Sequence, residues 1–277
     1  MNKKVIDIDN VFDDFLVKYI NENKGKFTEK QWEEKIPVMY LEFGSTPLEE
    51  LDGATPEEYY ADLTGEELAK LLASHVEQKV PVSDFLCEAL IKSDCEKYLV
   101  NYVDNEHDQT LVAYSVNVLN DKKSTLALDR YLKLILNDQT CNDMKELLAE
   151  SLVNHAVLVK EQVLENYERA GVNSFYLLEI LSVCKKDDRV LEILLNELKS
   201  HLTDIPVYVN YVMQYGDEKA LPTLLELIDN EKINYVDFKE LKFAIEFLGG
   251  EYTKERDFSN DKYYKRIKGA KNETSSN

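Results

Sequence analysis

Residues that break helices are scarce in this sequence of 277 residues. It contains nine glycines and six prolines, against a hydrophobic content of 44%. No apolar run reaches the roughly 18 residues that a membrane-spanning helix needs. The acidic residues Asp7 and Asp9 interrupt the N-terminus before any apolar stretch forms, which is not the pattern of a secretory signal. These absences predict an all-α protein with no membrane partner.

Motifs for metal, nucleotide and covalent chemistry are missing as well. No HExxH, GxGxxG, GxxxxGK[ST] or GxSxG pattern occurs, so the sequence predicts no cofactor and no reaction. The cysteines have neither CxxC nor metal-type spacing, which favours reduced, buried thiols and a cytoplasmic location. They are Cys87, Cys95, Cys141 and Cys184.

Charge is distributed unevenly along the chain. The formal net charge is −20, yet residues 254–277 hold seven Lys or Arg and four Asp or Glu, which leaves −23 for residues 1–253. An acidic body of this size repels a phosphate backbone, so no nucleic-acid partner is expected. The basic tail also contains Tyr263 and Tyr264, a composition suited either to nucleic acid or to docking on the acidic body.

Helix starts are clear in the first hundred residues. Ser or Thr followed three residues later by Glu or Gln forms a capping box, in which two backbone N–H groups gain partners. Five such pairs begin at Thr28, Thr46, Thr55, Thr64 and Ser93. Together with apolar spacing they predict helices at 7–22, 28–35, 47–51, 56–62, 64–79, 83–92 and 94–103.

A regular rhythm begins near residue 105. The apolar positions of Asp188–Leu195 recur about 30 residues later in Asp217–Leu225. In the second helices, Leu178, Leu181 and Ser182 match Tyr208, Tyr211 and Val212, and then Leu241, Ala244 and Ile245. Looser copies occupy 110–136 and 144–168. A period of about 30 to 34 residues, with one helix pair in each, indicates units that cover one another's apolar faces. We therefore divide the chain into an irregular helical region (1–104), helical repeats (105–253) and a basic, partly disordered tail (254–277).

One pair of helices carries a family resemblance. Residues 216–249 combine an Asp-x-x-Ala-x-Pro-x-Leu-x-x-Leu first helix with an Ala-x-x-x-Leu-Gly close of the second. This unit resembles a HEAT repeat. The resemblance implies a right-handed α-solenoid of helical hairpins whose second helices line a concave face, and it implies a scaffold that binds a protein or peptide.

Two other interpretations stay open. The resemblance also extends to nucleic-acid-binding or base-repair proteins, which would need a basic groove. An enzyme could assemble its site only on folding, and Asp104, Glu106, His107 and Asp108 form the densest group of possible metal ligands. An inter-helix turn capped by Asp108 accounts for the same residues.

The predicted working surface is the side of the second helices that points away from the repeat core. Its polar, mixed-sign composition suits a protein or peptide partner. The predicted binding residues are Glu179, Lys186, Asn210, Gln214, Lys242 and Glu246. Leu224 and Leu248 are expected to be fully buried and Glu226 exposed.

Overall fold

A computed structural model describes residues 3–105 and 108–274. Every regular element in these two ranges is a helix and none is a strand, so the all-α prediction is confirmed. The chain separates into two compact units, 1–131 and 132–277. The segment boundaries predicted after residues 104 and 253 mark changes of sequence pattern and stay predictions.

The first unit contains six complete helices within its described residues. They are α1 (Ile8–Glu22), α2 (Glu29–Gly44), α3 (Gly65–Gln78), α4 (Asp84–Lys92), α5 (Glu96–Asn105) and α6 (Gln109–Asp121), with a 3-10 turn at Glu49–Leu51. Helix α7 (Leu128–Ile135) spans the boundary between the units.

Two of the five predicted capping boxes form completely. Thr28 with Gln31 caps α2, and Thr64 with Glu67 caps α3. Thr46 and Ser93 instead close the preceding helices, because their hydroxyls donate to Glu42 O and Leu90 O. A hydroxyl between two helices can cap either the preceding or the following helix, and here it caps the preceding one.

Three predicted helices in the first third differ from the structure. Helix α2 continues through Pro37 to Gly44 instead of ending at residue 35. The predicted helix 56–62 is a chain of tight turns, with bonds from Glu58 N to Thr55 O and from Ala61 N to Glu58 O. The predicted helix 47–51 shrinks to its 3-10 turn because Asp52 follows in the left-handed region, at φ 57°.

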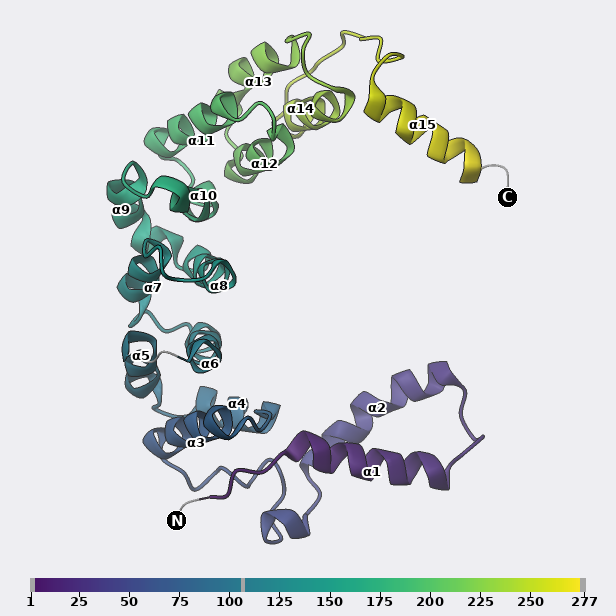
Figure 1. The fold of residues 1–277 in the computed structure, drawn as a ribbon, viewed down its shortest axis with the longest axis vertical. Helices are drawn as coiled ribbons and strands as arrows, with labels where there is room; N and C mark the ends of the chain where they lie inside the picture. The colour runs from purple at the N-terminus through teal and green to yellow at the C-terminus, as the bar shows by residue number, and fades with distance from the viewer. Residues whose placement is uncertain (1–2, 106–107, 275–277) are drawn as a thin grey trace. The chain divides into compact units, whose positions relative to one another are not determined.

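Most helices of the second unit form two rows. Helices α9 (Ala156–Tyr167), α11 (Asp188–Ser200) and α13 (Leu221–Ile228) form the first row. The second row contains α8 (Asn142–Val153), α10 (Ser174–Ser182), α12 (Ile205–Tyr215) and α14 (Tyr235–Phe247). Figure 1 shows the rows side by side, and each second-row helix packs on its neighbours in that row.

Burial in the second row repeats at one constant spacing. Leu148, Ile180, Val212 and Ala244 follow one another at equal intervals and expose no surface. The hydrogen bond from Ser182 Oγ to Gln214 Oε1, 2.8 Å, joins two residues at the same separation of 32 positions. The predicted equivalence of Tyr208 with Leu178 is therefore wrong, and Tyr208 is half-buried.

In the first row the predicted match between α11 and α13 is confirmed. Leu194 and Leu224 occupy equivalent positions and both are fully buried. Glu226 is exposed as predicted. Leu248 is only half-buried, contrary to expectation, because α14 ends at Phe247 and Leu248 is its C-cap.

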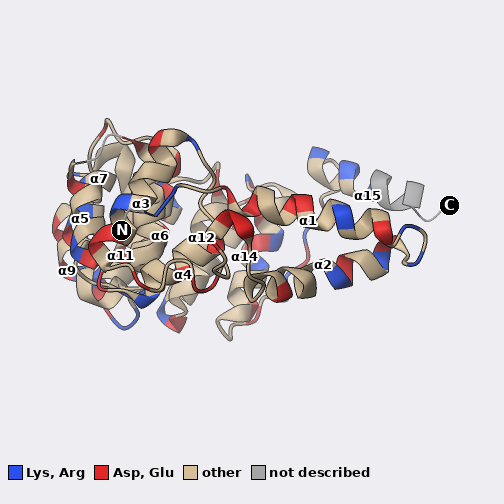
Figure 2. Cartoon of the chain, turned by 90° about the horizontal axis from the view of Figure 1, so that it is seen from below, with Lys and Arg blue, Asp and Glu red and all other residues tan. Residues whose placement is uncertain are grey.

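The basic segment after α14 partly docks on its own unit. Lys254 Nζ lies 2.6 Å from an Asp229 carboxylate oxygen, and the Arg256 guanidinium donates to Ile228 O and Asn230 O. Helix α15 (Lys262–Thr274) follows, with Lys and Arg on successive turns (Figure 2). Residues 275–277 lie outside the described residues, and the partly disordered character of the tail stays a prediction.

Candidate interaction surface

All six predicted binding residues lie on or beside the second row. Asn210, Gln214 and Glu246 are exposed on α12 and α14, whereas Glu179 and Lys242 are half-buried. Lys186 is exposed in the turn after α10 with a left-handed backbone, φ 64°.

The register of the second row aligns these residues across neighbouring helices. Asn210 and Lys242 occupy one register position, and Gln214 and Glu246 occupy another. Glu179 shares its position with Tyr211 and Phe243. Most of the predicted set therefore belongs to one repeating face of the row.

Sequence reasoning missed the apolar part of this face. Four large apolar side chains of α10, α12 and α14 are between 42% and 60% exposed: Phe175, Val207, Phe243 and Phe247. Phe175 and Val207 occupy equivalent register positions, a signal that the correct register would have shown. Exposed rings on a face of helices that otherwise bury their apolar residues mark a surface suited to contact.

Ring contacts tie the apolar residues of α10 to those of α12. The centroids of Phe175 and Tyr211 lie 6.1 Å apart in an edge-on arrangement, and Tyr211 contacts Tyr208 at 6.4 Å. Tyr208 stacks on His201 at 4.3 Å. Burial, with the Glu179 carboxylate nearby, raises the pKa of Tyr211 to about 12. These phenols stay neutral and present a rigid aromatic strip.

Carboxylates gather beside this strip. Burial raises the pKa of Glu179, and the negative charges of Glu150 and Glu146 on α8 raise it further. Among the described residues no Lys, Arg or His forms an ion pair with any of the three. A half-buried carboxylate without a paired cation is electrostatically unfavourable.

A hollow of about 640 Å³ lies at the C-terminal ends of α12 and α14. Its lining includes two of the predicted residues, Lys186 and Gln214, with Lys185, Gly216 and Phe247. Lysines line this hollow together with the exposed ring of Phe247, so this end of the face combines charged and apolar side chains.

Asp187 fixes the turn that carries Lys186. Its carboxylate bonds Arg189 and Lys160, both at 2.7 Å, and these cations hold its pKa well below the usual range. The Asp187 backbone N–H donates to Tyr215 Oη at 2.7 Å, and Tyr215 donates back to Asp187 O at 2.9 Å. Residues from α9, α11 and α12 therefore meet at one turn.

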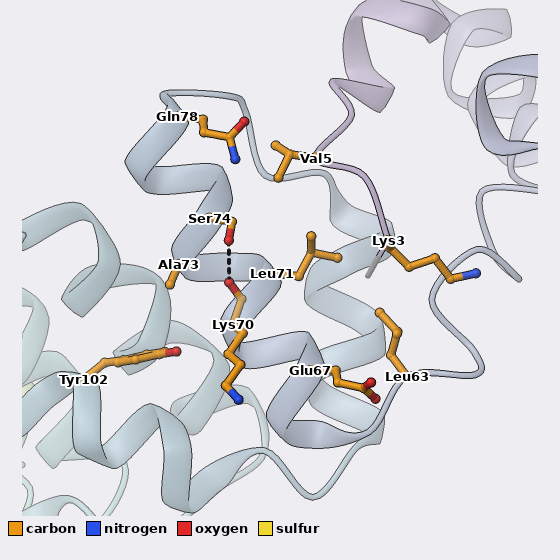
Figure 3. A pocket seen from close by; sticks show the side chains of 10 residues that line it. All are labelled: Lys3, Val5, Leu63, Glu67, Lys70, Leu71, Ala73, Ser74, Gln78 and Tyr102. Atoms are coloured by element: carbon orange, nitrogen blue, oxygen red, sulfur yellow. Dashed lines mark hydrogen bonds between the residues drawn. The ribbon is translucent and has the colours of Figure 1, made fainter. Parts of the chain in front are cut away.

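The first unit has a separate hollow of about 540 Å³ against α3 (Figure 3). Three of its polar side chains bond within α3 or at its N-cap. Glu67 completes the α3 capping box, Lys70 Nζ pairs with Glu66 at 2.7 Å, and Ser74 Oγ donates to Lys70 O at 2.9 Å. These groups stabilise α3 and do not converge on a common point.

Two of the four possible metal ligands near residue 104 have other structural roles. Glu106 and His107 lie outside the described residues. Asp104 pairs with Arg130 Nε, and Asp108 Oδ1 caps α6 by accepting from Thr110 N at 2.8 Å. Across 3–105 and 108–274 no three His, Cys, Asp or Glu side chains are grouped so as to hold a metal ion.

In the same residues, no helix has the length and apolar character needed to cross a membrane.

Comparison with protein-family models, with curated proteins and with solved structures gives no match in any of the three.

Proposed function

We propose that this chain is a HEAT-like, right-handed α-solenoid that binds a protein or peptide through the exposed face of its second-row helices. We define this face, the row face, by residues on α8, α10, α12 and α14: Glu146, Glu150, Phe175, Glu179, Gln214, Lys239, Lys242, Phe243 and Glu246. The observation that carries the proposal is the exposure of Phe175, Phe243 and other large apolar side chains on helices that bury most of their remaining apolar residues.

Two further features support this function. The regular repetition of buried positions along the second row is what stacked helical hairpins require, since each unit must cover its neighbour. Exposed rings surrounded by polar groups of both signs match the core and rim of a modest protein interface. The function as proposed needs no cofactor, and a cytoplasmic location fits four cysteines that remain thiols.

The test begins with the tagged full-length chain as bait in a lysate of the native cell. A captured protein is then purified, and its affinity is measured by isothermal titration calorimetry. Phe243→Ala, and the double charge reversal of Glu179 and Lys242, should each weaken binding by about tenfold or more, which is about 1.4 kcal/mol. The melting temperatures should stay within a few degrees of the wild-type value.

Leu225→Ala is the matched control, because Leu225 is an exposed apolar residue of the first row, on α13. It should leave the affinity unchanged. Equal loss from Leu225→Ala and Phe243→Ala would contradict a role for the row face. Loss confined to substitutions in residues 28–62 would move the binding surface to the first unit.

A second measurement separates the nucleic-acid interpretation. Duplex DNA should not be retained at about 0.15 M salt, where charges are screened beyond about 8 Å. Micromolar DNA binding that survives deletion of residues 254–277 would favour a nucleic-acid-binding function instead.

A further inference from the structure

The row face is electrically polarised along the row. At the α8 and α10 end it carries Glu146, Glu150 and Glu179, with no cation paired to them among the described residues. At the α14 end it carries Lys239 and Lys242, the latter 3.9 Å from Glu246. A ligand lying along the row meets negative charge at one end and mixed charge at the other.

Apolar surface lies beside the negative end. Phe175 is 44% exposed, and its ring contacts Tyr176 and Tyr211 at centroid distances of 6.0 and 6.1 Å. Burial and the negative charge of Glu146 raise the pKa of Tyr176, and burial and the charge of Glu179 raise that of Tyr211. Both carboxylates therefore lie near these rings. A ring and a carboxylate side by side suit a cationic side chain whose methylene stem packs on the ring.

We propose that the row face binds a helical segment of a protein partner, with Lys or Arg residues over Glu146, Glu150 and Glu179 and an apolar side chain on Phe175. This inference rests on the proposed function. It adds the chemistry of the partner and the end of the row at which its cationic residues lie. Charge complementarity selects this occupant: a cationic group gains three carboxylates, whereas an anionic segment would be repelled by them. A helix whose apolar residues recur every three or four positions can follow the exposed residues of successive helices.

The probe is a fluorescein-labelled amphipathic peptide of about 14 residues built only from Leu and Lys at helical spacing, measured by fluorescence anisotropy at about 0.15 M salt. A second peptide has Glu at every Lys position. The full-length chain should bind the Lys peptide and not the Glu peptide. Binding of both with equal affinity would overturn the inference, because contact would then be apolar alone.

Matched variants separate a specific site from general attraction to an acidic protein. Glu150→Gln with Glu179→Gln removes two charges from the row face, and Glu192→Gln with Glu226→Gln removes two exposed charges from the first row. The first pair should weaken the Lys peptide at least about tenfold, the second less than about twofold. Equal effects of the two pairs would overturn the inference. Phe175→Ala should weaken binding as well, and no effect would exclude the apolar contact.

The outcome for a captured natural partner distinguishes this inference from the proposed function. If Phe243→Ala weakens that partner and the Glu150 and Glu179 pair does not, the row face binds a partner that is not cationic, and only the inference fails. Sedimentation velocity tests a second copy as occupant, since α15 is itself basic. Self-association that is lost in the Glu150 and Glu179 double variant would overturn the assignment to a separate protein.

Discussion

Leu224 offers the sharpest test of how the second unit is packed. Its side chain exposes no surface between α13 and the neighbouring helices, whereas Leu225, the next residue on the same helix, is 37% exposed. The same substitution at adjacent positions therefore compares a core site with a surface site. Helix propensity and the chemical change are identical, so the difference measures burial.

The magnitude follows from the buried side chain. Replacing a fully buried leucine by alanine removes its transfer free energy and leaves a cavity, which costs about 2–5 kcal/mol. At Leu225 part of the side chain is already in water, so the expected cost is below about 1 kcal/mol. Glu226→Ala, at an exposed polar position, should change stability by less than about 0.5 kcal/mol.

The assay is urea denaturation followed by far-ultraviolet circular dichroism. Leu224→Ala should lower the midpoint while leaving the dependence of the unfolding free energy on urea unchanged. Hydrogen exchange should locate the loss of protection in α13 and α14, because the packing of repeated helices is local. Equal destabilisation by Leu224→Ala and Leu225→Ala would refute the burial pattern of the first row.

Three further predictions concern electrostatics and close packing. Asp187→Asn should flatten the pH dependence of stability: the native pKa is lowered, so the contribution is complete above the ordinary Asp range and is lost as the pH falls below about 4. An acid melting series that is the same for variant and wild type would contradict this. Glu179→Gln should raise the melting temperature at neutral pH by roughly 1–3 °C, because it removes a half-buried carboxylate whose pKa burial and like charges have raised. A lower melting temperature would show that Glu179 has a favourable partner. Gly65→Ala should destabilise by about 1–3 kcal/mol in urea, since the new methyl would lie 2.5 Å from the backbone carbon of Asp94, and a neutral result would mean that α3 shifts freely.

Local chemistry in the sequence determined the helices. The capping boxes at Thr28 and Thr64 formed as predicted because Thr, Glu and Gln reach their backbone partners within one turn, without help from the rest of the chain. The burial of Leu224 beside the exposed Glu226 followed from helical spacing alone. These features depend on residues that lie within a single helical turn of one another.

Tertiary packing decided the register of the second row and the character of its face. First-row helices match at a slightly shorter spacing than second-row helices, because turns of unequal length separate them, and only contacts such as the bond of Ser182 to Gln214 fix the alignment. The sequence alone aligned Leu178 with Tyr208 and then with Leu241, at two unequal spacings, and did not identify the exposed Phe175 as part of the face. The packing of α8 beside α10 places Glu179 near two other carboxylates and partly out of water. This contact joins separate helices, so the spacing of residues within one helix does not predict it.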